Sequence, residues 1–144
     1  AVDLSVGDGG IESGFDRVLV DAPCTGLGTL RRRPEILLRL GPEDPARMAR
    51  LQGAILDRAV SLLRPGGVLM YVVCSGSAQE GHEAARALER RHPGLTRLRT
   101  SPQGLPLEAD DDGLFRIGPW LGDGRGTPDV YQAARWQLAA EPPV

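Results

Sequence analysis

The spacing of apolar residues changes several times along the chain, and each change marks a predicted element. A compact apolar run over 17–20 lies between Gly14 and Pro23 and predicts a short buried strand. A second run over 68–73 is apolar throughout, which is typical of a strand covered on both faces. Further strand candidates lie at 2–6, 95–99, 114–117 and 130–138.

Two stretches between these runs have helical spacing. From 44 to 63, apolar residues recur every three or four positions and form one face, with Pro45 in the first turn. The glycines of RPGG at 64–67 lie where a helix end places them. A second helix is expected over 78–91. The segments expected to be loops are 9–14, 25–34 and 101–113.

The order of these elements predicts the fold class. Strands that alternate with helices favour an α/β sheet with a largely parallel core. A length of 144 residues corresponds to a single domain. The first residues, from Val2 to Gly10, resemble the middle of an α/β domain rather than its beginning. We therefore expect a fragment or an excised domain.

Composition limits the class of partner and the compartment. The formal net charge of −2 gives no general attraction to nucleic acid, so any such attraction has to be local. Three consecutive arginines, Arg31, Arg32 and Arg33, provide a local positive charge. Two cysteines are too few for a disulfide framework or a zinc site. With no membrane-length apolar run and no signal peptide, we expect a cytoplasmic protein with reduced thiols.

Reactive side chains follow both central strands. Asp21 and Cys24 come after the first strand, whereas Cys74 and Ser75 come after the second. Ligands of open α/β sheets bind beyond the carboxyl ends of the strands, so we expect the two thiols in one crevice. The alternative for each cysteine is a small buried side chain without chemistry. The flanking Asp-x-Pro, glycine and serine residues favour the reactive interpretation.

Two longer segments carry a more specific signal. The segment DAPCTGLGTLRRRPE, from Asp21 to Glu35, contains Asp-Ala-Pro-Cys-Thr-Gly, a Gly-Thr turn and a basic stretch. The segment LLRPGGVLMYVVCS, from Leu62 to Ser75, leads from Pro-Gly-Gly through a strand to Cys-Ser. In this order they resemble two motifs of the Sun/Nop (Fmu-like) family of RNA 5-methylcytosine methyltransferases. The resemblance covers about 8–136.

This resemblance implies a fold and an activity. The fold is a Rossmann-like class I methyltransferase sheet with flanking helices, truncated at its amino end, and residues 1–144 form the carboxyl-terminal part of the catalytic domain. The implied activity is S-adenosylmethionine-dependent methylation of carbon 5 of cytosine in ribosomal RNA. Cys74 would attack carbon 6, Cys24 would assist the later elimination, and Asp21 would hydrogen-bond or protonate the ring nitrogen.

Cofactor and RNA contacts follow from the same resemblance. Asp8 would contact the adenosine part of S-adenosylmethionine, and Asp21 is a second cofactor-binding candidate. Arg31, Arg32 and Arg33 would neutralise phosphates beside a flipped nucleotide; the alternative is a solvated loop. No Gly-x-Gly loop follows a strand in the expected order, so we expect the chain alone to bind the cofactor poorly and to be inactive.

Three departures from the family pattern keep other interpretations open. Val73 replaces a threonine, Pro128 replaces an acid, and the run Gln79–Glu80–Gly81 stands where the family has an acidic pair and an asparagine. Val73 and Gly81 favour a catalytically silent RNA-binding module derived from this fold. For an active enzyme, transfer RNA is the alternative substrate. A small-molecule or DNA methyltransferase is a third possibility, and in a DNA enzyme the earlier cysteine is the nucleophile. His82 and His92 lack partners at ligand spacing, so no metal is expected.

Overall fold

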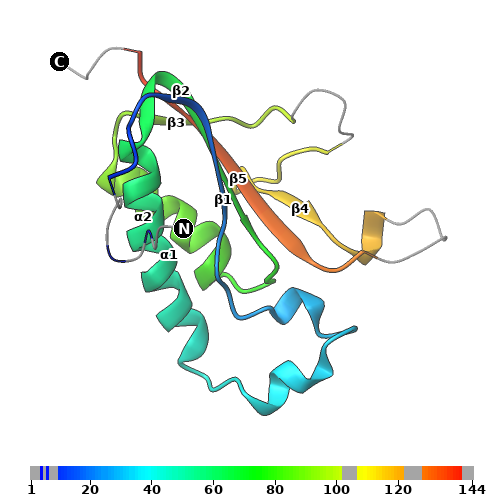
Figure 1. The fold of residues 1–144 in the computed structure, drawn as a ribbon. Coiled ribbons are helices and arrows are strands. Elements are labelled where there is room, and N and C mark those ends of the chain that lie inside the picture. The colour runs from blue at the N-terminus through cyan, green and yellow to red at the C-terminus, as the bar shows by residue number, and fades with distance from the viewer. Residues whose placement is uncertain (1–3, 5, 7–9, 102–106, 122–127, 141–144) are drawn as a thin grey trace.

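The computed structural model describes residues 4, 6, 10–101, 107–121 and 128–140, and it contains a mixed sheet with helices α1 and α2 on one face (Figure 1). The order of the sheet is β1-β2-β5-β3, and β4 pairs with β5. The strands are β1 (Phe15–Asp21), β2 (Leu63–Val73), β3 (Leu95–Arg97), β4 (Phe115–Ile117) and β5 (Tyr131–Leu138). The helices are α1 (Asp44–Ser61) and α2 (Ala84–Arg91).

Strand direction agrees only in part with the sequence analysis. Strands β1 and β2 are parallel, as expected for strands joined by a helix. Strand β5 lies between β2 and β3 and is antiparallel to both, and β4 is antiparallel to β5. The expected α/β class is confirmed, but a largely parallel core is wrong for the described strands. The described part of the β3–β5 connection holds β4 and a 3₁₀ turn but no α-helix, the element that usually makes the crossover between parallel strands.

Most predicted elements are present, with shifted boundaries. The helix predicted over 44–63 is α1, and the helix predicted over 78–91 is a π-helical turn, η3 (Gln79–Glu83), followed by α2. Strand β2 already begins at Leu63, so the RPGG segment belongs to the strand. The loop after β1 contains two 3₁₀ turns, η1 (Leu27–Thr29) and η2 (Pro34–Leu38). The strand predicted at 2–6 is wrong for Leu4 and Val6, which lie in turns, and its other residues lie outside the described ones.

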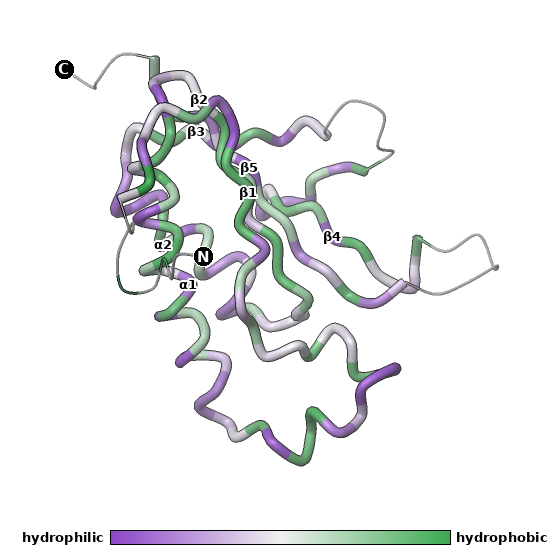
Figure 2. The backbone as a smooth tube through the Cα atoms, in the orientation of Figure 1, coloured by the Kyte–Doolittle hydropathy of each residue, from purple (hydrophilic) through white to green (hydrophobic). Residues whose placement is uncertain are grey.

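The hydrophobic core lies between the sheet and the two helices. Figure 2 shows hydrophobic stretches of the central strands running through the middle of the fold. Alternate residues of β2 point into this core, and the helices contribute one apolar face each. The core residues with no exposed surface are Leu56, Ala59, Leu69, Val73, Ala85, Leu88, Ala134 and Trp136.

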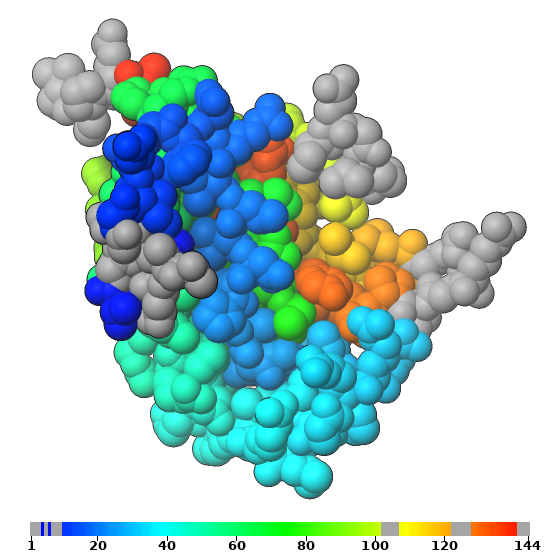
Figure 3. Space-filling model, viewed as in Figure 1, coloured from blue at the N-terminus to red at the C-terminus, as the bar shows by residue number. Residues whose placement is uncertain are grey.

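The opposite face of the sheet is covered only in part. Val68, Met70 and Val72 of β2 are half-buried there, and Leu19 of β1 is 66% exposed. Residues of β1 and β2 are visible at the surface in the space-filling view (Figure 3). The expectation that 68–73 is covered on both faces is therefore wrong for the described residues, in which no helix packs against this second face.

Candidate active site

The two cysteines lie together at one edge of the sheet. Parallel pairing aligns Asp21 with Val72, so the chain leaves β1 and β2 at the same edge. Cys24 Sγ is 3.2 Å from Cys74 Sγ, both side chains are partly exposed, and both thiols are free. The structure thus brings together two residues fifty positions apart, as the strand pattern led us to expect.

The surroundings of Cys24 favour its protonated form. Burial raises the pKa of Cys24 to about 12, and the hydrogen bond with Cys74 acts in the same direction. Cys24 therefore keeps its proton at neutral pH and can donate its S–H toward the sulfur of Cys74. One sulfur of the pair is consequently a proton-bearing partner of the other.

A buried carboxylate lies beneath the cysteine loops. Glu80 is fully buried in η3, and its carboxylate accepts hydrogen bonds from residues that directly follow the two cysteines. Thr25 donates its backbone N–H over 2.8 Å and its hydroxyl over 2.5 Å, and the hydroxyl of Ser75 donates over 2.7 Å. The sequence alone predicted no role for Glu80 in the site. An acid six positions after the second cysteine was the available signal.

The Glu80 cluster is connected to helix α1 through Gln52. This fully buried amide donates to the carbonyl of Pro23 over 2.9 Å and to Glu80 over 3.1 Å. The hydroxyl of Tyr71 lies 2.8 Å from Gln52 Oε1 and 2.7 Å from the backbone oxygen of Glu80. Burial, followed by the charge of Glu80, raises the pKa of Tyr71, so this hydroxyl remains a donor. The loops that carry the cysteines therefore pack against buried polar side chains, Gln52, Tyr71 and Glu80, that all have hydrogen-bond partners.

Gly28 joins three chain segments at the site. Its N–H donates to the carbonyl of Cys74 over 3.0 Å, and its carbonyl accepts from the N–H of Val130 over 2.9 Å. A Cβ at Gly28 would overlap the carbonyl oxygen of Val130. Only glycine allows the backbones to approach so closely here. Gly28, a glycine of the first motif, therefore holds the loop after β1 against the segment that follows β2 and the segment that precedes β5.

The three arginines have different surroundings. Arg32 forms a two-pronged ion pair with Asp129, whose side chain is fully buried. Arg33 lies 3.8 Å from Glu35, and both side chains are exposed. Arg31 is exposed and lines a hollow of about 220 Å³ beside the start of β5. Arg32 thus holds its own loop to the segment before β5, whereas Arg31 and Arg33 present their charge at the surface.

Asp21 lies at the carboxyl end of β1 and is exposed. Within the described part of the chain, its carboxylate has no hydrogen-bond or ion-pair partner. This leaves the carboxylate available to a ligand at the edge where the thiols meet. Asp8, the other cofactor-binding candidate, lies outside the described residues.

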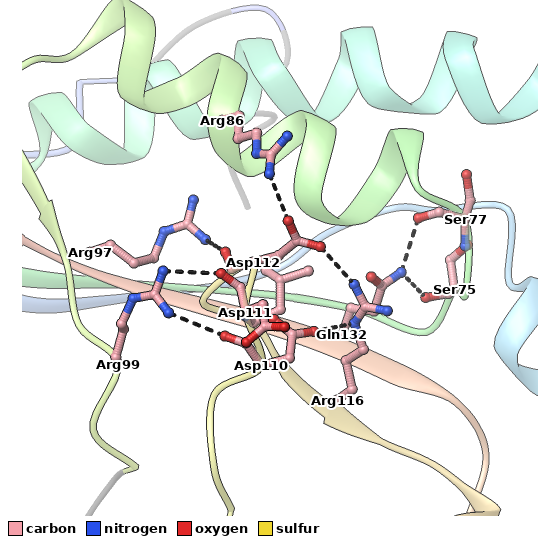
Figure 4. A network of polar contacts seen from close by, with 11 residues as sticks. Ser75, Ser77, Arg86, Arg97, Arg99, Asp110, Asp111, Asp112, Arg116 and Gln132 are labelled. Atoms are coloured by element: carbon pink, nitrogen blue, oxygen red, sulfur yellow. Dashed lines mark hydrogen bonds and ion pairs between the residues drawn. The ribbon is translucent and has the colours of Figure 1, made fainter.

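Two residues that depart from the family pattern, Val73 and Gly81, have closely packed surroundings. Val73 is fully buried in the hydrophobic core. Gly81 faces the side-chain amide of Gln132, which would overlap a Cβ at this position. That amide donates to the carbonyls of Ser75 and Ser77 over 2.7 and 3.0 Å, as Figure 4 shows. A glutamine from β5 therefore fills the space beside Gly81 and holds the segment after Cys74.

The described ranges contain neither a grouped set of metal-binding side chains nor a membrane-length apolar helix. Among these residues, no three side chains of histidine, cysteine, aspartate or glutamate are grouped as a metal ion would require. Within the same part of the chain, no helix has the length and apolar character needed to cross a membrane.

Two solved structures from Pyrococcus horikoshii have a similar fold. The crystal structure of NSun6 from Pyrococcus horikoshii with SFG matches with a TM-score of 0.68 and 27% identity, over 90% of this chain and 31% of that one. A methyltransferase homolog protein from the same organism matches over 88% and 40% of the two chains, with a TM-score of 0.66. Its 23% identity shows the fold alone. The described strands and helices therefore form part of a methyltransferase fold.

The family follows from the sequence comparisons. The family model of the 16S rRNA methyltransferase RsmB/F matches residues 2–117. Ribosomal RNA small subunit methyltransferase B of Thermus thermophilus is 53% identical over 119 residues, which cover 83% of this chain and 28% of that protein. The protein of the same name from Cronobacter sakazakii is 38% identical and is matched over 78% of this chain and 29% of its own length. The chain belongs to the RsmB/F family, which confirms the resemblance to the Sun/Nop methyltransferases.

Proposed function

We propose that residues 1–144 form the carboxyl-terminal part of the catalytic domain of a cytoplasmic, S-adenosylmethionine-dependent RNA methyltransferase. The proposed reaction is methylation of carbon 5 of cytosine in ribosomal RNA. The observation that carries this proposal is the Cys24–Cys74 pair, 3.2 Å apart beyond the ends of two adjacent parallel strands. The names of the matched relatives support ribosomal RNA as the substrate.

Each sulfur has a distinct role in the proposed mechanism. Cys74 Sγ forms a bond to carbon 6 of the cytosine, which makes carbon 5 nucleophilic. After methylation, carbon 5 passes its proton to water, and the electron pair of that C–H bond re-forms the ring double bond and expels the Cys74 sulfur from carbon 6. Cys24, which keeps its proton because of its raised pKa, donates a hydrogen bond to the sulfur of Cys74 as this sulfur departs. The partly exposed position of both thiols leaves them accessible to a flipped base.

Asp21 lies at the same edge of the sheet as the thiols and is the proposed contact for the cytosine ring or the cofactor. The exposed carboxylate of Asp21 has no partner in the described residues, and this fits a ligand-binding role. It would hydrogen-bond or protonate the cytosine ring as negative charge develops there, or hold the cofactor. S-adenosylmethionine supplies the methyl group when bound, and a P. horikoshii relative was solved with SFG, an analogue of this cofactor. Asp8 is proposed to contact its adenosine part.

The arginine segment is the proposed contact with the RNA backbone. Arg31 and Arg33 are exposed and would neutralise phosphates, a contact that positions RNA without reading its sequence. Arg32 would contribute charge while its ion pair with Asp129 fixes the loop. A catalytically silent RNA-binding module is the second candidate, favoured by the departures at Val73 and Gly81. The burial of Val73 and the contact between Gly81 and Gln132 give both departures a structural role outside the thiol pair.

Variants of the two cysteines in the full-length parent protein test the proposal. We expect Cys74→Ala to abolish both methyl transfer and covalent attachment to RNA. Cys24→Ala should still permit attack and methylation and then stall, so a denaturant-resistant protein–RNA adduct accumulates. Gel mobility of labelled RNA after denaturation reports the adduct, and mapping of the methylated base in ribosomal and transfer RNA identifies the substrate.

The remaining outcomes each exclude one interpretation. If Cys24→Ala abolishes attachment to RNA and Cys74→Ala accumulates the adduct, Cys24 is the residue that attacks carbon 6, as in DNA cytosine methyltransferases. If wild type and both variants all fail to methylate or attach to RNA yet still bind it, the silent module is correct. Glu83→Ala serves as the matched control, because Glu83 is exposed and lies close to the site in sequence.

A further inference from the structure

We propose that Glu80 is the positioning residue of the thiol pair: it sets the distance between Cys24 and Cys74 by holding the residue that follows each of them. This inference rests on the proposed function, because it assigns Glu80 a part in the same reaction. Glu80 touches neither sulfur in the described contacts, so it would act through Thr25 and Ser75.

The carboxylate joins three segments that are far apart in the sequence. One oxygen accepts from the backbone N–H of Thr25 and from Gln52, and the other accepts from the hydroxyls of Thr25 and Ser75. The two hydroxyl oxygens are themselves 3.2 Å apart. Because Thr25 and Ser75 are bonded to the cysteines, a displacement of either loop would stretch one of these hydrogen bonds.

The chemistry of the cluster favours positioning over simple stability. Glu80 is fully buried, and all four donors to its carboxylate are neutral groups. Burying a carboxylate is costly, and a well-packed apolar side chain often gives equal or greater stability at such a place. What an apolar side chain cannot do is fix the relative direction of two loops. The four hydrogen bonds do this, because each requires a defined distance and angle.

The backbone around Glu80 is shaped for this contact. Glu80 lies in the π-helical turn η3, in which Gly81 departs from helical geometry with φ −101° and ψ −108°. Single π-helical turns occur frequently at functional sites. On the other side, Gln132 fixes the carbonyl of Ser75. The segment after Cys74 is therefore held from both sides, by Glu80 through a hydroxyl and by Gln132 through a carbonyl.

Kinetics of Glu80 variants in the full-length parent protein provide the first test. A displacement of about 1 Å at reacting groups can cost about 100-fold in rate. We expect Glu80→Ala to lower kcat by about 100-fold while KM for RNA stays within about twofold, because the proposed RNA contacts lie at the arginine segment. Glu80→Gln keeps the shape but gives up one acceptor oxygen, and should lose about tenfold. Glu83→Ala, the exposed neighbour, should leave both parameters unchanged.

A second measurement does not depend on methylation. Phenylarsine oxide binds two neighbouring thiols: its As–O bond is replaced by two As–S bonds, and the two thiol protons leave with the oxygen as water. The 144-residue chain has only these two cysteines, so bridging reports their separation. We expect Glu80→Ala to weaken bridging at least tenfold, with the reaction of each thiol toward a monofunctional maleimide changed less than twofold. The Cys74→Ala variant has only one thiol, so its binding of phenylarsine oxide gives the background signal without bridging.

The outcomes separate this inference from the proposed function. Weakened bridging in a chain whose parent shows no methylation would support the positioning role and reject the methyltransferase activity. Unchanged bridging and unchanged kcat in Glu80→Ala would overturn the positioning role and leave the cysteine mechanism standing. If thermal unfolding shows that Glu80→Ala does not fold, Glu80→Gln decides, because wild-type bridging and kcat in a folded Glu80→Gln protein would likewise overturn the inference.

Discussion

Two polar clusters hold loops of this chain in place, one buried and one exposed. The buried cluster surrounds Glu80 and consists of a carboxylate with neutral donors. The exposed cluster surrounds the acidic loop 110–112, where Asp110 and Asp112 pair with arginines from neighbouring elements (Figure 4). The arginines drawn around this loop are Arg86, Arg97, Arg99 and Arg116.

The two clusters differ in whether water can replace a hydrogen bond or ion pair that is broken. If an exposed ion pair is broken, both groups remain hydrated, and such pairs contribute about 0–1 kcal/mol. A buried polar group that loses its partner cannot form a replacement hydrogen bond with water. The free energy of unfolding then falls by about 1–3 kcal/mol. Asp112 is 30% exposed at its side chain, whereas Glu80 and Gln52 are fully buried. The number of charges in a cluster is therefore a poor guide to its contribution to stability.

The largest expected effect comes from the buried cluster. Gln52→Leu keeps the approximate size of the side chain but leaves the carbonyl of Pro23 without its donor. We expect the free energy of unfolding to fall by about 2–3 kcal/mol, measured by urea denaturation of the 144-residue chain. Gln137→Leu is the matched control, because Gln137 is exposed and donates one 3.2 Å hydrogen bond to Gly66. Equal losses in the two variants would show that burial does not distinguish these amides.

An intermediate effect is expected at the contact between Gly81 and Gln132. Gly81→Ala would push the Gln132 amide off the two carbonyls that it binds, so stability should fall by about 1–2 kcal/mol. Gln132→Ala in the same chain removes the overlap, so the double variant should lose less than the sum of the single losses. Additive losses would contradict this contact. Gly53→Ala in the middle of α1 is the control and should be neutral or stabilising, since alanine favours helix.

The smallest effect is expected in the exposed cluster. Asp112→Asn removes the charge that faces Arg86 at 2.7 Å and Arg116 at 3.4 Å. We expect stability to change by less than about 0.5 kcal/mol, with the change vanishing near 1 M salt, where the Debye length is about 3 Å. Urea denaturation at low and high salt measures both values. A loss above about 2 kcal/mol that persists at high salt would place this loop in the same energetic class as the Glu80 cluster.

The parts of the structure that could be predicted from the sequence are those that a short, contiguous stretch of residues determines. Strands β1 and β2 are marked by apolar runs. Cys74 directly follows the second run, and Cys24 lies shortly after the first, beyond Asp21. Because such strands pair in parallel across a helix, the meeting of Cys24 and Cys74 could be expected before the structure was known. The family was likewise predictable, since its motifs are contiguous stretches of the sequence.

The remainder depends on contacts between distant residues. Nothing near β5 specifies that it enters between β2 and β3 and runs antiparallel to both. Glu80 meets Thr25 across fifty-five positions, and Arg32 meets Asp129 across ninety-seven. The three consecutive arginines look alike in the sequence. Only in the structure does Arg32 differ from the others, because it pairs with the buried carboxylate of Asp129. Sequence spacing gives no means of singling that member out.

The backbone contacts of Gly28 have a consequence for the order in which the protein acquires its shape. Gly28 is bonded to Cys74 and to Val130, so two chain closures of very different length have to be completed at one residue. The longer closure waits for a segment that the ribosome makes about a hundred residues after Gly28, and long closures slow folding. We expect the thiol pair to be reactive but imprecisely placed in a nascent chain, and to gain its final spacing only when β5 has been synthesised.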